Sequence, residues 1–87
     1  MANYKIYLKS SAKKELESLP DKILVRIVDK IKSLSANPRP KGCEKLSAEE
    51  KYRIRQGNYR IIYAIEDDKL IIYVVKIGHR RDVYKSK

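Results

Sequence analysis

The chain has 87 residues, of which 43% are hydrophobic and 37% are charged, and its formal net charge is +10. This length suits a single domain, residues 1–87, with a modest core, and it excludes a second domain or a deep cofactor cavity. The composition is that of a globular protein and not of a disordered one. No apolar run approaches the roughly 18 residues of a membrane span, and the N-terminus lacks an apolar signal core, so we expect a cytoplasmic protein with no membrane partner.

Most of the positive charge lies in two segments. Residues 51–65 and 76–87 together contain nine basic side chains and one acidic side chain, and so hold +8 of the net +10. Interspersed charges would indicate an ordinary solvated surface. Charge segregated in this way is typical of a surface that binds a polyanion.

The N-terminal part is predicted to form a strand and two helices. Residues 3–8 alternate between apolar and polar side chains, which indicates a strand. Residues 12–19 repeat apolar side chains at helical spacing, and Pro20 separates them from a second, longer helix. That helix is predicted from an apolar stripe formed by Ile23, Leu24, Ile27, Val28, Ile31 and Leu34. It should end near Asn37, because the residue before a proline is disfavoured in the helical conformation.

The C-terminal part is predicted to form three strands. Residues 38–50 contain two prolines and a glycine and indicate a connecting loop, with a short helical turn near 47–50. Strands are expected at about 51–56, 59–66 and 69–77. The element order β-α-α-β-β-β predicts an α+β fold, in which two N-terminal helices pack on one face of a mostly antiparallel four-stranded sheet.

The hairpin between the first two of these strands sets the neighbours of its arginines. If Gly57 is the first central residue of a two-residue turn, Arg55 faces Arg60 across the hairpin. Alternation along the strands then places Arg53, Arg55 and Arg60 on one face of the sheet. Because like charges directly opposite each other destabilise a sheet, a fold that keeps them there indicates an anionic ligand.

The sequence contains few other residues that could form a metal, cofactor or catalytic site. One histidine, one cysteine and scattered carboxylates do not have the spacing of a metal site, and there is no glycine-rich phosphate loop, so we expect no metal and no cofactor. The single cysteine, Cys43, excludes an intramolecular disulfide. Arginine and tyrosine on strands remain, and they suit phosphodiester binding or cleavage, since guanidinium groups bind phosphate oxygens in pairs and tyrosine rings stack on unpaired bases.

Two motifs resemble a known family. Residues 52–63 read Tyr-Arg-Ile-Arg-Gln-Gly-Asn-Tyr-Arg-Ile-Ile-Tyr, and residues 77–84 read Ile-Gly-His-Arg-Arg-Asp-Val-Tyr. Together with the length, the element order and the helix pair interrupted by proline, they resemble the toxins of the RelE/ParE superfamily of bacterial type II toxin–antitoxin systems over residues 4–84. The RelE-like fold is therefore expected.

The C-terminal tyrosine is similar to that of the RelE branch, and this resemblance implies an activity and partners. The implied activity is that of an mRNA interferase, a hydrolase acting as an endoribonuclease on mRNA in the ribosomal A site and so inhibiting translation. The RNA 2′-hydroxyl would attack the phosphate without a metal ion and leave a 2′,3′-cyclic phosphate. The implied partners are the ribosome with its mRNA and an acidic, RelB-like antitoxin.

The resemblance also implies roles for individual residues. Arg60 would bind the scissile phosphate and offset charge in the transition state. Arg80 would be a second cation near the leaving oxygen, and Tyr84 would stack on or orient an mRNA base. RNA binding outside the catalytic group would fall to Arg53, Arg55 and Arg81.

The chain departs from the family pattern at Arg53 and Arg55, where RelE-like toxins commonly carry lysines. Arginine stays protonated in proteins and so cannot replace a lysine as a general base. His79 is a candidate for the catalytic base or acid, because its unperturbed pKa of about 6.5 suits proton transfer. The other interpretation is that His79 belongs to the basic patch and replaces a family lysine.

Two other functions stay open. One is that of a ParE-like toxin, which inhibits gyrase and has no nuclease activity; Tyr84, Arg60 and Arg80 together favour the nuclease instead. The other is that of a noncatalytic basic RNA-binding module, which would bind RNA with a strong dependence on salt.

Overall fold

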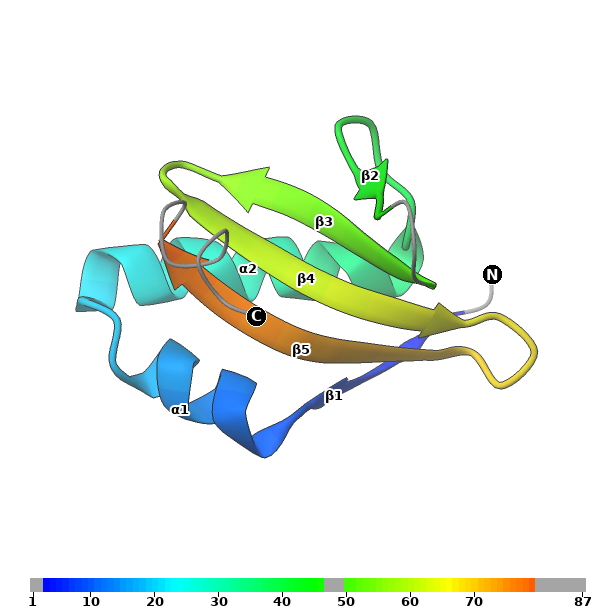
Figure 1. Ribbon diagram of the computed structural model, residues 1–87, viewed down its shortest axis with the longest axis horizontal. Helices are drawn as coiled ribbons and strands as arrows, with labels where there is room; N and C mark the ends of the chain where they lie inside the picture. The colour runs from blue at the N-terminus through cyan, green and yellow to red at the C-terminus, as the bar shows by residue number, and fades with distance from the viewer. Residues whose placement is uncertain (1–2, 47–49, 80–87) are drawn as a thin grey trace.

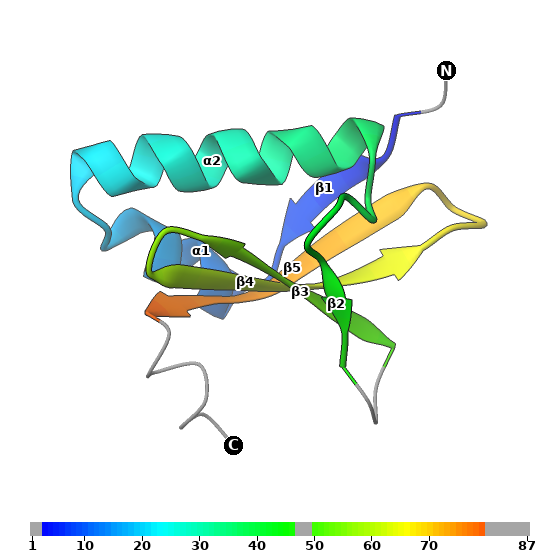
Figure 2. The same ribbon diagram turned by 90° about the horizontal axis from the view of Figure 1, so that it is seen from above.

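The computed structural model describes residues 3–46 and 50–79. Within these ranges the strands form one sheet in the order β1-β5-β4-β3-β2, in which β1 and β5 are parallel and the other pairs antiparallel. Figure 2 shows α2 lying along one face of this sheet, and in Figure 1 the sheet stands in front of α2. The elements are β1 (Lys5–Leu8), α1 (Ser10–Glu17), α2 (Asp21–Ala36), β2 (Glu44–Lys45), β3 (Lys51–Gln56), β4 (Tyr59–Glu66) and β5 (Ile71–His79).

The predicted α+β class is confirmed, and one strand must be added to the predicted four. The added strand is β2, which pairs with β3 inside the segment expected to be a loop. A strand of two residues is too short to show an alternating pattern in the sequence. It forms because the edge of β3 offers hydrogen-bond partners. Of the helical turn predicted near 47–50, residues 47–49 lie outside the described residues.

The core lies between α2 and the sheet. The helix buries Ile27, Ile31 and Leu34, which belong to the stripe predicted from helical spacing. The strands bury alternate residues against them, and the alternation shifts by one residue in β5. The buried strand residues are Ile54, Ile61, Tyr63, Ile72, Val74 and Ile77. The residues that alternate with these buried positions therefore point to the face of the sheet that α2 does not cover. We call this surface the open face.

The outer edge of β5 is covered by β1 and then by a side chain of α1. β1 pairs with β5 as far as Leu8 opposite Val74, and just beyond this point β5 carries a register irregularity. Further along, Glu15 of α1 accepts two hydrogen bonds: Oε1 from the Ile77 backbone N–H at 2.9 Å, and Oε2 from Lys76 Nζ at 2.8 Å. The carboxylate satisfies an edge amide beyond the end of β1 and ties α1 to the sheet.

We expect Glu15→Ala to lower the free energy of unfolding by about 1–3 kcal/mol, because it leaves a partly buried amide and an ammonium group without their acceptor. Urea unfolding measures this loss. The matched control is Glu17→Ala in the same helix, where the exposed side chain predicts a change within about 0.5 kcal/mol. Equal stability of the two variants would contradict the role given to Glu15.

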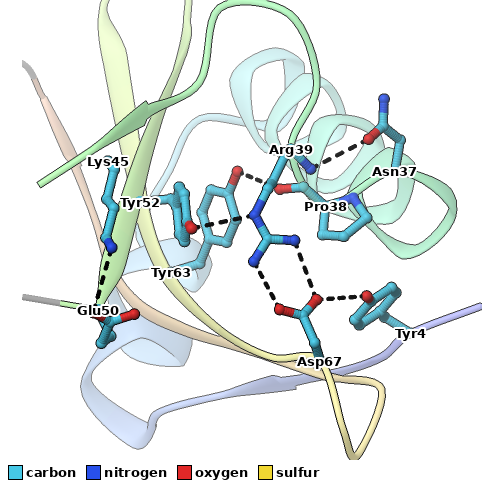
Figure 3. Close-up of polar contacts among 9 residues, drawn as sticks. All are labelled: Tyr4, Asn37, Pro38, Arg39, Lys45, Glu50, Tyr52, Tyr63 and Asp67. Carbon is cyan, nitrogen blue, oxygen red and sulfur yellow. Dashed lines mark hydrogen bonds and ion pairs between the residues drawn. The ribbon is translucent and has the colours of Figure 1, made fainter.

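A second polar cluster closes the opposite end of the sheet (Figure 3). Arg39, from the loop after α2, donates two hydrogen bonds to the Asp67 carboxylate, at 3.1 and 2.8 Å. Its Nε donates to the Tyr52 hydroxyl at 3.2 Å, and its guanidinium lies 5.1 Å from the centre of that ring. Tyr4 donates to Asp67 from the N-terminal side at 2.7 Å. The cluster thus joins the start of the chain, the α2–β2 loop, β3 and the β4–β5 turn.

Asp67 makes this cluster sensitive to acid. Its hydrogen bonds from Arg39 and then from Tyr4 lower its pKa to about 2, against about 3.9 in an unfolded chain. A carboxyl group whose pKa is lower in the folded state stabilises the fold fully above the unfolded pKa and loses this contribution as pH falls. We expect Asp67→Asn to be less stable than the wild type at pH 6, with the difference vanishing between about pH 4 and pH 2. Unfolding curves across this range, with Asp68→Asn as control, test it; a difference independent of pH would contradict it.

Candidate nucleic-acid interface

The β3–β4 hairpin has the register predicted from its turn. Gly57 has a φ of +62°, a backbone conformation that glycine adopts without strain. Arg55 faces Arg60 across the hairpin, and Ile54 faces Ile61. Because both isoleucines are buried against the helix side, the two arginines point to the open face, together with Arg53. The structure therefore brings all three arginines of the hairpin together.

The three arginines differ in exposure. Arg55 is exposed and Arg53 is half-buried, whereas Arg60 is only 2% exposed. On β5 the cross-strand neighbour of Arg60 is Gly78, which has no side chain to displace the guanidinium. A charge held in such a position interacts with an anion more strongly than a charge in water, and it needs little rearrangement to do so.

Glu44, a carboxylate that was not expected at this surface, indicates that the electrostatic potential here is positive. Glu44 of β2 faces Arg53 and accepts a hydrogen bond from its Nη2. This hydrogen bond is the main cause of the lowered pKa of Glu44, and the charges of Arg53, Arg55 and Arg60 lower it further. All three guanidinium groups thus stabilise a negative charge at this position. The sequence did not indicate it, because Glu44 meets Arg53 only through the short strand β2.

The structure does not bring His79 to the hairpin arginines Arg53, Arg55 and Arg60. His79 pairs with Tyr59 at the end of the β4–β5 ladder, and their ring centroids lie 5.6 Å apart in an edge-to-face arrangement. Tyr59 packs against the core cluster on the helix side, and both residues line a depression beside Ser18 and Leu19. The His79 ring therefore lies on the face opposite to Arg60.

Three predicted site residues, Arg80, Arg81 and Tyr84, lie outside the described residues, and their roles stay predictions. Within residues 3–46 and 50–79, no three or more His, Cys, Asp or Glu side chains are grouped so that they could hold a metal ion. In the same ranges, no helix combines the length and the apolar character needed to cross a membrane.

These features define a class: a small α+β protein that clusters guanidinium groups on the sheet face opposite α2, suited to a polyanion. Residues 6–84 match the family described as the ParE toxin of the type II toxin–antitoxin system parDE. The chain is 29% identical to the toxin RelG of Mycobacterium tuberculosis, over 94% of this chain and 97% of RelG. It is 35% identical to the RelE1 protein of Methanocaldococcus jannaschii, over 84% of this chain and 86% of that protein.

Solved structures show the same fold. The toxin–antitoxin complex RelBE2 of Mycobacterium tuberculosis contains a chain with a TM-score of 0.82 and 28% identity, covering 92% of this chain and 94% of its own. The RelE–RelB complex of Pyrococcus horikoshii contains one with a TM-score of 0.81 and 27% identity, covering 90% and 96%. The chain therefore belongs to the RelE/ParE superfamily and is a toxin of a type II toxin–antitoxin system, as the two sequence motifs predicted.

Proposed function

We propose that this toxin is an endoribonuclease that cleaves mRNA in the ribosomal A site and so inhibits translation. The observation that carries the proposal is the convergence of Arg53, Arg55 and Arg60 on the open face, with Arg60 held in a buried position. A gyrase inhibitor that does no chemistry on a phosphate has no evident use for a buried guanidinium. A phosphoryl-transfer site needs a fixed positive charge of this kind.

The reaction that fits these groups is an internal transfer at one phosphate. The RNA 2′-oxygen loses its proton and bonds to the adjacent phosphorus, and the bond from phosphorus to the 5′-oxygen of the next nucleotide breaks. The 5′-oxygen then takes up a proton, and a 2′,3′-cyclic phosphate remains. Arg60 stabilises the extra negative charge on the phosphate oxygens, while Arg53 and Arg55 hold neighbouring parts of the strand. Arg80 and Tyr84 complete the site in this proposal, at the leaving oxygen and on a base.

The proposal also includes a protein partner. Both solved structures described above are complexes of a toxin with its antitoxin, and this chain carries a net charge of +10. An acidic, RelB-like antitoxin would therefore meet a complementary surface here, and by covering the arginines it would keep the toxin inactive.

Cleavage of a defined message on programmed ribosomes tests the function. We expect a break within the A-site codon, a 2′,3′-cyclic phosphate at the new 3′ end, and no cleavage when the scissile nucleotide carries a 2′-deoxy sugar. The matched control is the same message without ribosomes. Cleavage of the 2′-deoxy message would exclude attack by the 2′-hydroxyl.

The description of the matching family as a ParE toxin favours a second candidate, inhibition of gyrase. Expression of the toxin separates the two activities. DNA-damage signalling with intact mRNA would assign the chain to gyrase inhibition. Cut mRNA without such signalling would assign it to the nuclease.

His79 is expected not to transfer the proton, because its ring packs on Tyr59 at the face opposite to Arg60. His79→Gln should therefore keep the rate of mRNA cleavage within about twofold and leave its pH dependence unchanged. Cleavage rates between pH 5.5 and 8.5 measure this. A pH profile that changes in the variant would restore His79 as the catalytic base or acid.

A further inference from the structure

Two exposed tyrosines lie beside each other on the open face. Tyr7 of β1 and Tyr73 of β5 are direct cross-strand neighbours, and their rings stack with centroids 5.6 Å apart. They remain 46% and 40% exposed, and they are two of the four large apolar side chains that the described residues leave exposed. Paired aromatic rings at the surface are typical of a binding site.

The sheet register connects this pair to the arginines. Tyr73 faces Ala64 on β4, and Ala64 faces Lys51 on β3, so that one row across the open face reads Tyr7, Tyr73, Ala64 and Lys51. Arg60 lies on β4 four residues before Ala64, which corresponds to roughly 13 Å along the strand. A short stretch of one RNA strand can span this distance.

We propose that Tyr7 and Tyr73 form a stacking subsite for a base of the RNA strand whose phosphate lies on Arg60, an inference that rests on the proposed function. The small Ala64 side chain leaves room beside the Tyr73 ring for a planar group. Tyrosine rings stack on unpaired bases of any sequence, and such a contact contributes about 1–3 kcal/mol for each base.

The charges around the tyrosine pair indicate which way a bound RNA strand continues across the sheet. Lys5 faces Ile71 on the turn side of Tyr7 and lies in one row with Glu66, which offsets its charge. Beyond the row, Asp67 of the β4–β5 turn is paired with Arg39, and Asp68 is followed by Lys69, so this end offers phosphate no net positive charge. The other end of the open face carries Arg53, Arg55 and Arg60. An RNA strand on the tyrosines is therefore expected to continue toward the arginines and not past the turn.

The chain contains no tryptophan, so Tyr73→Trp introduces one fluorescent reporter at the subsite. The probe is a single-stranded RNA of twelve nucleotides with 2′-O-methyl sugars, which lack the attacking hydroxyl. We expect this RNA to quench the indole of Tyr73→Trp. The control is Val25→Trp, at a position 59% exposed on α2, which should bind the same RNA without quenching. The dissociation constant should rise about 5- to 150-fold for Tyr73→Ala and stay unchanged for Tyr73→Phe.

Failure of this subsite can be told apart from failure of the proposed function. Quenching of Tyr73→Trp in a toxin that leaves mRNA uncut would keep the subsite and overturn the nuclease. Absence of quenching while the 2′-O-methyl RNA is bound, or absence of RNA binding altogether, would overturn the subsite. A change in the indole signal that depends on protein concentration without RNA would assign the tyrosines to contact between two copies of the chain, and this too would overturn it.

Discussion

Replacing Arg60 with alanine is expected to abolish growth arrest and to slow mRNA cleavage on the ribosome by at least about 10²–10³-fold. The reason is that Arg60 is only 2% exposed, with Gly78 and Arg55 as its cross-strand neighbours, so that its charge is already buried at the site before the phosphate arrives. An exposed, mobile cation would first have to be ordered at the phosphate, and so it would stabilise the transition state less. Single-turnover cleavage of a programmed ribosome complex measures the loss.

Stability measurements must accompany this variant. Arg60 faces Arg55, and like charges directly opposite each other destabilise a sheet. We therefore expect relief of this repulsion to offset part of the packing that is lost with a buried side chain, so that Arg60→Ala stays folded. Arg26→Ala, on the exposed surface of α2, is a matched loss of one arginine and should keep full activity. Full toxicity of Arg60→Ala would remove the centre of the proposed site.

The largest effect on stability is expected one residue further along the same strand. Ile61 is fully buried and faces Ile54 and Ile77 on its two neighbouring strands. Ile61→Ala should lower the free energy of unfolding by about 2–5 kcal/mol, because it removes apolar contacts and leaves a cavity. This is a large share of the roughly 5–15 kcal/mol that stabilise a domain. Thermal and urea unfolding measure the loss.

Ile62→Ala is the control for Ile61→Ala, because Ile62 alternates to the open face and is only half-buried. Its loss should be clearly smaller. Similar losses at both positions would mean that the two faces of β4 do not differ as the structure shows. Arg60 and Ile61 thus predict different phenotypes at adjacent positions: loss of activity in a folded protein, and a large loss of stability in a protein whose site residues are unchanged.

The sequence was most informative where a regular period or a turn restricts the backbone. The apolar stripe of α2 predicted the buried residues Ile27, Ile31 and Leu34, because a helix returns a side chain to the same face every 3.6 residues. Gly57 predicted the register of the hairpin, since a two-residue turn leaves one pairing for its strands. That pairing alone was enough to place the hairpin arginines on one face of the sheet.

The tertiary structure alone decided which residues from distant segments meet. Glu44 reaches Arg53 only because β2 adds to the edge of β3, and Arg39 reaches Asp67 only because the α2–β2 loop lies over the β4–β5 turn. His79 looked suited to catalysis by residue type, yet its pairing with Tyr59 places its ring on the helix side. Local periodicity specifies the face of each strand, but only the packing of whole elements determines which charges share a site.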